Sequence, residues 1–433
     1  ATTAANSTVV GHNAGTDVTT APQSTFIGGY SGFKVTTGSD NTAIGYGSLY
    51  QCTTGFQNTA LGRSALENHT GSLAVAVGQS ALQQNQTASN TAVGYVVAAN
   101  NTTGSGLTAM GYESMYLNTT GANNVAYGQQ SLRNNTTGGS NTALGHLALY
   151  TNTTASNNTA LGLQALYSNS SGTQNTGVGN NALYANTSGS YSTAVGHDAL
   201  KSNTSGVSNT AFGSIALDAM TTGNYNVAVG SGSLGAATTG SRNVAVGTSA
   251  LTDLTTASNN TAVGDGALAN NTTASNNVAV GKDALEANTT ANYNTAIGYE
   301  ALLSTTTGAE NTAVGAFALD AVTTGSQCTA VGYNAAPANT ATATTAVGHQ
   351  CLKANTSGAG NVAMGSKALF TNTTGQYNIS IGADSLQQNN ADNNVAVGHD
   401  ALKVNTTGNQ NVAVGANALD ANTTGSLNTA CGR

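Results

Sequence analysis

Three regularly spaced tyrosines are the residues of this sequence whose type and spacing best suit ligand binding. Tyr150, Tyr167 and Tyr184 follow one another at intervals of 17 residues. If they occupy the same place in successive structural repeats, their rings stack at a strand spacing of about 4.8 Å. Such a row of rings could grip a ligand such as a glycan, or it could stack only on itself or on a neighbouring chain. These three tyrosines are the candidate ligand-binding residues.

Histidines also share a place, directly after a glycine that recurs along the chain. This holds for His12, His146, His197, His349 and His399, and only His69 differs. His146 and His197 are three repeats apart, roughly 14 Å, so one ion cannot bridge them. Around the axis of a trimer, three copies of one histidine could converge on an ion. Within one chain we expect no metal site.

Catalytic signatures do not stand out. Residues 230–235 match the dinucleotide pattern GxGxxG, but the residues that follow repeat the turn of the other units instead of opening a helix. Asp283 and Glu286 are the closest carboxylate pair within one repeat, without a histidine in the neighbouring repeats. Asp198 and Lys201 recur as a pair only at 400 and 403, as a solvated face would allow. We expect neither enzyme activity nor a cofactor.

A short sequence repeat that recurs along the whole chain positions these side chains. A landmark glycine recurs at 26 places from Gly11 to Gly432, often at the end of a phrase of the form N-[TV]-A-[VIL]-G, with 21 steps of 17 residues and four of 16. A fixed short period is typical of a solenoid. We therefore expect residues 1–433 to form a single continuous solenoid of about 25 coils. Seven of these landmark glycines, taken as structural repeat residues, are Gly45, Gly62, Gly145, Gly162, Gly179, Gly196 and Gly213.

Counting each landmark glycine as position 0 gives every repeat the same pattern. Positions −3 and −1 are β-branched or aliphatic and alternate with a small residue, which predicts a short strand with those two side chains in the core. Position +4 is leucine in most repeats and predicts a second, inward-pointing strand. The expected core leucines include Leu149, Leu166, Leu183 and Leu200.

The following N-T-T-G or N-T-S-G stretch predicts a turn, because Asn, Thr and Gly favour turn conformations. In the 16-residue repeat after Gly382 the missing residue falls in this stretch. Position +7 is usually Asn, which indicates a ladder of side-chain hydrogen bonds between coils. Many of these residues also satisfy the N-glycosylation pattern, which turn composition alone produces.

Composition excludes several classes of partner. The net charge is −7 with only ten Lys and Arg residues, so a nucleic acid or an anionic membrane surface is not expected. No apolar run is long enough for a membrane-spanning helix, and the N-terminal residues lack the features of a signal peptide. Four scattered cysteines are too few for a disulfide scaffold and leave the redox compartment open. Because the chain ends one residue after a landmark glycine, we expect a segment of a longer protein.

The phrase N-T-A-V-G-x-x-A, at residues 260–267 and 311–318, resembles the S-V-A-I-G-x-x-S repeat of YadA-type heads. Those heads belong to trimeric autotransporter adhesins, and similar rolls occur in phage tail fibres. The resemblance covers essentially the whole chain. It implies an all-β fold, a left-handed parallel β-roll or β-solenoid, three chains in a homotrimer, and binding of a host-cell or matrix surface.

We therefore expect a structural or adhesive extracellular fibre on a cell or virion, whose receptor or glycan the sequence does not name. A phage tail fibre for host recognition is the alternative. An ice- or mineral-binding solenoid is a further alternative, suggested by paired threonines such as Thr153 and Thr154. Adjacent threonines of a strand point in different directions, which argues against a flat paired array.

Overall fold

The computed structural model describes residues 6–432, which form an all-β protein of two units. The N-terminal unit is Ala1–Thr222 and the C-terminal unit is Gly223–Arg433. Ala1–Ala5 and Arg433 lie outside the described residues. Between residues 6 and 432 no segment is helical, so none forms an apolar helix able to cross a membrane.

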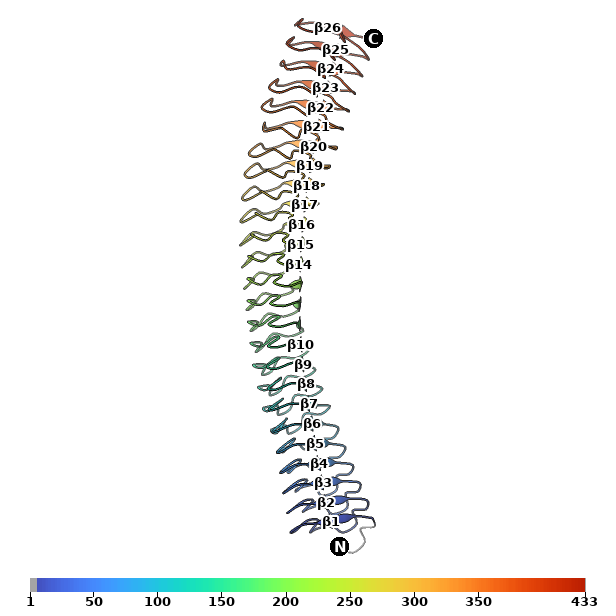
Figure 1. The fold of residues 1–433 in the computed structure, drawn as a ribbon, viewed down its shortest axis with the longest axis vertical. Coiled ribbons are helices and arrows are strands. Elements are labelled where there is room, and N and C mark those ends of the chain that lie inside the picture. Colours follow the sequence, from blue (N-terminus) through green and yellow to red (C-terminus); the bar gives the residue numbers. More distant parts are fainter. Residues whose placement is uncertain (1–5, 433) are drawn as a thin grey trace. The chain divides into compact units, whose positions relative to one another are not determined.

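Each turn of the chain contributes one strand of three residues (Figure 1). In the N-terminal unit the strands are β1 (Thr8–Val10), β2 (Thr25–Ile27), β3 (Thr42–Ile44), β4 (Thr59–Leu61), β5 (Val75–Val77), β6 (Thr91–Val93), β7 (Thr108–Met110), β8 (Val125–Tyr127), β9 (Thr142–Leu144), β10 (Thr159–Leu161), β11 (Thr176–Val178), β12 (Thr193–Val195) and β13 (Thr210–Phe212).

The strands of the C-terminal unit have the same length and place in the repeat. They are β14 (Val227–Val229), β15 (Val244–Val246), β16 (Thr261–Val263), β17 (Val278–Val280), β18 (Thr295–Ile297), β19 (Thr312–Val314), β20 (Thr329–Val331), β21 (Thr345–Val347), β22 (Val362–Met364), β23 (Ile379–Ile381), β24 (Val395–Val397), β25 (Val412–Val414) and β26 (Thr429–Cys431).

Within each unit every strand pairs in parallel with the next strand along the chain. Equivalent residues are partners, as in Leu144 with Leu161. The register survives the shorter steps, since Leu61 still pairs with Val77 across 16 residues. Each unit is therefore a parallel β-solenoid, and the expectation that the turn absorbs the missing residue is confirmed.

Leucine at position +4 is buried as expected, but it does not lie in a second strand. Leu149 is fully buried in a turn and has a φ of 52°. An extended strand requires negative φ, so this backbone cannot continue as one. The turn is nevertheless bonded to its neighbour, because the Leu149 N–H donates to the carbonyl of Ala165 one turn later.

The predicted orientation of the strand is wrong. In β9 the middle residue, Ala143, is buried, whereas Thr142 and Leu144 are exposed. Position −2 faces the leucine of the preceding turn: a Cβ on Gly177 would lie 3.4 Å from Cγ of Leu166. With leucine filling the interior, only a small residue fits opposite it, and the larger residues of the strand point outward.

The first two turns lack the leucine at +4, and another side chain fills the core there. Position +4 is glycine in the first two turns, at Gly15 and Gly32, and the strand between them carries Phe26 at position −2. Phe26 is fully buried, and a side chain on Gly32 would overlap its ring. One large ring thus fills the space of two missing leucines.

The landmark glycines lie where the backbones of successive turns approach closely. Gly128 has a φ of 133°, and a Cβ there would lie 2.6 Å from the carbonyl oxygen of Gly145. Both the backbone angle and the contact exclude a side chain. The glycine allows the chain to bend out of the strand while the turns stay at strand spacing.

We predict that Gly128→Ala opens the solenoid locally. The backbone strain alone costs about 1–3 kcal/mol, and the overlap with Gly145 adds to it. Gly232→Ala is the matched control, because Gly232 also has positive φ but a Cβ there meets no atom within 4 Å. Limited proteolysis should cleave the Gly128 variant near residue 128; equal resistance of the two variants would contradict this role.

Candidate functional site

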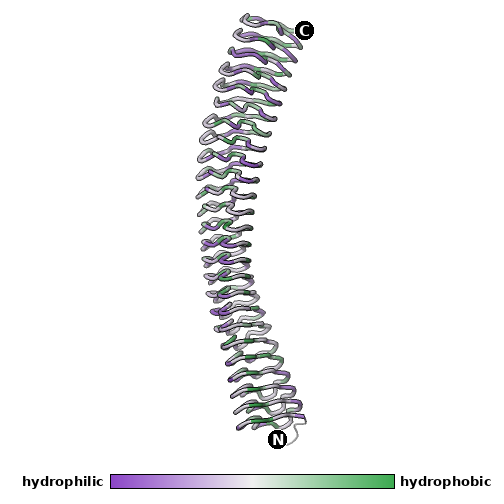
Figure 2. Tube along the Cα trace, in the orientation of Figure 1, coloured by the Kyte–Doolittle hydropathy of each residue, from purple (hydrophilic) through white to green (hydrophobic). Residues whose placement is uncertain are grey.

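The outward side chains of the strands form the most regular surface of each unit, which we call the strand face: positions −3 and −1 of every turn. Position −3 is only Thr, Val or Ile, and position −1 is only Val, Ile, Leu, Met, Phe, Tyr or Cys. No charged residue stands at either position. Hydrophobic segments recur from turn to turn in Figure 2. In the N-terminal unit the strand face extends over thirteen strands, roughly 58 Å.

The large side chains of the strand face are open to solvent in the single chain. Leu144 and Leu161 are each 41 % exposed, and Phe212 is 55 % exposed. Monomeric proteins rarely leave so long a continuous apolar surface uncovered, and such surfaces mark interaction sites. The strand face is therefore the first candidate interaction site, and the sequence analysis missed it by placing these residues in the core.

Buried asparagines align the turns. Asn152 at position +7 donates from Nδ2 to Oδ1 of Asn135 at 2.8 Å, and Asn169 donates to Asn152 at 3.1 Å. The amide ladder predicted at +7 is confirmed. The asparagines of the N-glycosylation patterns at this position have buried side chains. Met220 occupies position +7 in the turn after that of Asn203 and offers no amide, so Asn203 Oδ1 is left without a partner.

A second ladder runs through the asparagine that opens the repeated phrase, at position −4. Asn141 accepts from the backbone N–H of Asn158 at 3.0 Å and donates from Nδ2 to the carbonyl of Ala155 at 2.9 Å. Asn152 donates to the same carbonyl at 3.0 Å. The two ladders thus share an acceptor in each such turn, and the asparagine that most often opens the phrase is the signal that could have identified the second one.

His69 occupies position +7 in place of asparagine and is fully buried. Its partners suit a neutral ring: Nε2 lies 3.1 Å from Oδ1 of Asn58, and Nδ1 lies 2.9 Å from Nδ2 of Asn85 and 3.1 Å from the Asn85 carbonyl. The tautomer in which Nε2–H donates and Nδ1 accepts satisfies the two side-chain contacts. Burial lowers the pKa of His69 to about 4, against the weaker opposing effect of backbone carbonyls. The one histidine outside the shared register is therefore a ladder residue.

Cysteines also stand in buried columns. Cys52 is at +7, Cys328 at −4 and Cys351 at +3; all three are buried, whereas Cys431 is exposed. Burial raises the pKa of Cys52 to about 11 and that of Cys351 to about 12. Such thiols are poor nucleophiles. No disulfide joins cysteines in the described part of the chain.

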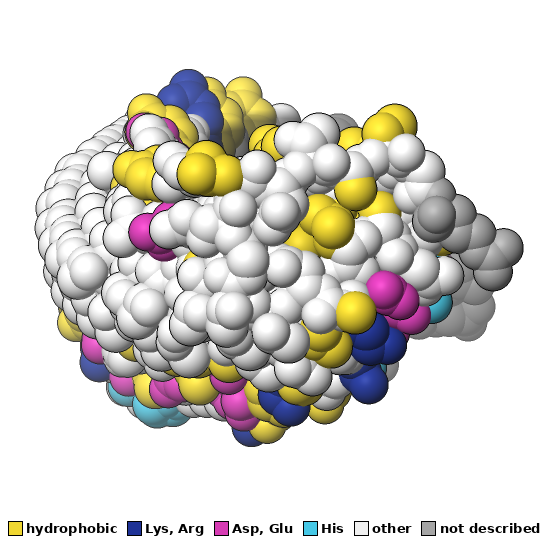
Figure 3. Space-filling view, turned by 90° about the horizontal axis from the view of Figure 1, so that it is seen from above, with side chains coloured by type: hydrophobic (Ala, Val, Ile, Leu, Met, Phe, Trp, Pro, Cys, Tyr) yellow, Lys and Arg dark blue, Asp and Glu magenta, His cyan; other side chains and the backbone are white. Residues whose placement is uncertain are grey.

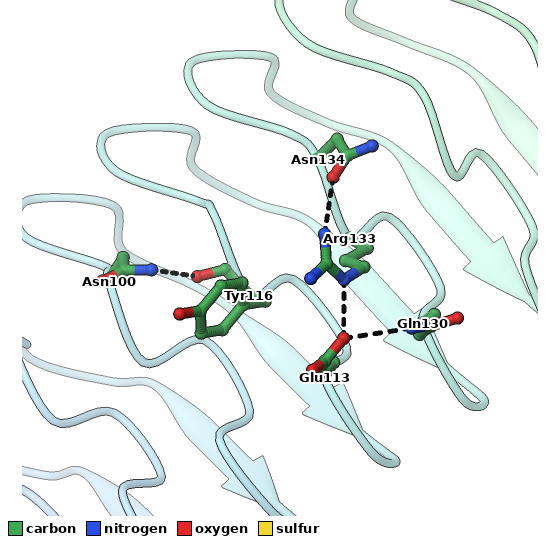
Figure 4. Close-up of polar contacts among 6 residues, drawn as sticks. All are labelled: Asn100, Glu113, Tyr116, Gln130, Arg133 and Asn134. Atoms are coloured by element: carbon green, nitrogen blue, oxygen red, sulfur yellow. Dashed lines mark hydrogen bonds and ion pairs between the residues drawn. The ribbon is translucent and has the colours of Figure 1, made fainter.

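Positions +1, +2 and +5 form a second surface, the variable face, which holds most of the charged side chains. In the view of Figure 3, charged and histidine side chains gather along one side. Glu113 accepts from Arg133 Nε at 2.6 Å and from Gln130 at 3.0 Å (Figure 4), and these bonds lower the pKa of Glu113. The Arg133 guanidinium also lies 5.2 Å from the centre of the Tyr116 ring.

The candidate tyrosines lie together on the variable face, as their spacing predicted. The rings of Tyr150 and Tyr167 are 5.3 Å apart, and those of Tyr167 and Tyr184 are 5.2 Å apart, nearly parallel in both cases. Burial, then the flanking phenols, raise the pKa of Tyr167. Because both faces of Tyr167 are covered, this ring offers a ligand only its edge and hydroxyl.

Among residues 6–432, one group of three potential metal ligands comes together: Asp384, His399 and Asp400, with ligand atoms within 4.8 Å of one another. Lys403 Nζ already lies 2.9 Å from Oδ1 of Asp400, and Gln387 donates to Asp384 at 2.8 Å. Since both carboxylates have partners, we assign no ion here. Convergence of the position +1 histidines on an axial ion stays a prediction.

The motifs set aside as non-catalytic lie in ordinary turns. Residues 230–235 contain no helix, and Gly232 has the positive φ of other residues at +2. Asp283 pairs with Lys282 at 3.1 Å, and Asp198 pairs with Lys201 at the same distance. No protein-family model matches the sequence, and comparison with curated proteins finds no match.

We predict that His69 makes the solenoid acid-sensitive near residue 69. Between pH 6.5 and about 4 the unfolded chain binds a proton that the folded chain does not, so stability is lost as pH falls through this window. Lowering the pKa of His69 from 6.5 to about 4 corresponds to about 3 kcal/mol.

The comparison protein is His69→Asn, which restores the amide of the ladder. Native-state hydrogen exchange at Leu66 and Val75 should show faster opening of the unmodified protein at pH 4 relative to this variant, and a smaller difference at pH 7. A difference between the two proteins that does not change with pH would contradict the assignment.

Proposed function

We propose that this chain is the repetitive segment of a structural and adhesive fibre on the surface of a cell or virion. The fibre is a homotrimer of left-handed β-rolls, in which the strand faces of three chains pack together and the variable faces carry contacts with a receptor. The number of chains, the hand and the extracellular location follow the resemblance to YadA-type heads.

The observation that carries the proposal is the uninterrupted apolar strand face. Covering it removes apolar surface from water, which stabilises an assembly by about 25 cal/mol for each Å² buried. A monomer would also depend on a small core: the turn of Leu149, for example, buries this leucine, small residues and the side chains of Asn152 and Asn158. Association along the strand face adds the apolar burial that a single turn lacks.

The register of the repeat favours a second copy of this chain as the partner. Every strand presents a β-branched residue at −3 and an apolar residue at −1, at a constant spacing along the unit. Another copy presents the same series with the same spacing, so contacts made in one turn repeat in the next. Closed symmetry would satisfy the strand faces of all chains equally.

The alternatives differ in what the fibre is attached to and what it touches. A phage tail fibre for host recognition would use the same assembly. An ice- or mineral-binding solenoid is supported by the exposed threonines at −3, such as Thr142 and Thr159. The neighbouring row holds bulky residues, including Tyr127 and Phe212, which interrupt the flatness that a crystal surface requires.

We predict that charge on the strand face breaks the assembly. Thr142→Glu with Thr159→Glu would bury two carboxylates per chain, each at a cost of several kcal/mol. Sedimentation equilibrium should give the unmodified protein three times the 42.6 kDa chain mass and the variant a lower mass.

The matched control is Thr137→Glu with Thr154→Glu, two exposed threonines at position +9 of adjacent turns. This control should keep the threefold mass. If the unmodified protein is a stable monomer, or if both double variants remain trimers, the proposed assembly is wrong. Thermal hysteresis of ice growth in the same samples would favour the ice-binding alternative.

A further inference from the structure

A surface pocket of about 370 Å³ interrupts the variable face in the N-terminal unit. We call it the aromatic pocket; it is lined by Tyr30, Tyr46, Gly47, Tyr50 and Glu67. These residues come from three successive turns and occupy positions +1, +2 and +5. The volume is at the small end of the range found for ligand sites.

The pocket exists because position +2 is glycine in this turn. In the other turns of the N-terminal unit this position carries a side chain, for example Gln130 or Gln164. A Cβ on Gly47 would meet only Ser64 Oγ, at 3.8 Å. Gly47 therefore leaves a gap in the column of +2 side chains, between Tyr30 below it and Ser64 above it.

The tyrosine rings stand around this gap at different angles. The ring of Tyr30 is inclined by 70° to that of Tyr46 and by 46° to that of Tyr50, with centroids 5.7 and 6.3 Å apart. Tyr50 is held from behind by Phe33, whose ring stacks on it at 5.0 Å. Rings inclined in this way form the walls of a cage, whereas the parallel rings of Tyr150, Tyr167 and Tyr184 cover one another.

A carboxylate lies on the side of the pocket that faces the next turn. Glu67 and Tyr50 occupy the same position, +5, in consecutive turns. Glu67 accepts a hydrogen bond from Gln83. Within residues 6–432 no Lys, Arg or His forms an ion pair with it. No basic side chain of the described residues therefore competes with a cationic ligand for this carboxylate.

We propose that the aromatic pocket binds an alkylated ammonium group, such as the trimethylammonium of choline. Aromatic ring faces attract such a cation through their quadrupole, and an adjacent carboxylate adds direct charge attraction. A pyranose ring instead needs a flat, open aromatic platform, which inclined rings do not provide. The net charge of −7 also favours a cationic ligand over an anionic one.

The test titrates the full chain with choline and with its neutral isostere 3,3-dimethylbutan-1-ol, followed by NMR of the tyrosine rings. Choline should bind saturably in the millimolar range and the isostere about tenfold more weakly, since the isostere lacks the positive charge that the ring faces attract. Gly47→Gln should abolish binding and leave the fold intact, because glutamine occupies this position with positive φ in other turns.

Glu67→Gln should weaken choline binding by about three- to tenfold. Glu286→Gln, which changes the same position +5 in the C-terminal unit, should leave it unchanged. Equal affinity for choline and the isostere, saturable binding of a monosaccharide in place of choline, or choline binding that survives Gly47→Gln would each overturn the proposal.

Choline also forms the headgroup of phosphatidylcholine, and a second arm distinguishes these sources. Co-sedimentation with phosphatidylcholine vesicles that Gly47→Gln abolishes would assign the site to a membrane headgroup. Choline binding without vesicle binding would assign it to a soluble ligand. This site does not depend on the trimer, because all its residues belong to one chain, so it can fail or hold independently of the proposed fibre.

Discussion

In-register stacking of identical positions is the constraint on which this structure depends. Each turn lies one strand spacing from the next, so every side chain sits beside the same position of its neighbour. A given position can therefore repeat only a residue type that packs well against a copy of itself in the next turn. Glycine meets that condition where backbones nearly touch, asparagine where amide groups bond in series, and leucine where apolar side chains stack in the interior.

The same constraint separates three surfaces by chemistry. Leucine at +4 and the small residue at −2 leave room for nothing larger inside, so the big side chains of the strand turn outward and form an apolar strip. The turn residues at +1, +2 and +5 are not required to match the next turn, and there the charges, histidines and tyrosines collect. The proposed assembly surface and the proposed ligand site thus lie on different faces of the same coil.

The periodicity predicted the solenoid, the inward leucines, the tolerant turn and the asparagine ladder, because each of these follows from a residue type that recurs at a fixed position. The parallel strands were implied by the resemblance to YadA-type heads. It did not predict which face of the strand is buried. Alternation shows that two faces differ, but alanine and valine can each be the core residue, and the choice depends on how much space Leu149 and its equivalents already fill.

The sequence did not reveal the roles of residues that depart from the repeat, because those roles depend on residues in neighbouring turns. His69 is one isolated letter in the sequence, yet its position +7 places it among buried amides. Glycine is common in turns, so Gly47 does not stand out in the sequence. It opens a pocket only because Tyr30 and Glu67 lie in the turns on either side. Phe26 is understood only with Gly15 and Gly32, 11 residues before and six after it.

The central claim is that the strand face is covered by other copies of the chain. Leu144→Cys and Thr154→Cys, each made in a Cys431→Ser background, can be labelled with a maleimide under native conditions. Both positions are exposed in a single chain. We expect the thiol of Leu144→Cys to be protected until the assembly is dissociated, whereas that of Thr154→Cys reacts at once. Equal rapid labelling of the two would contradict it.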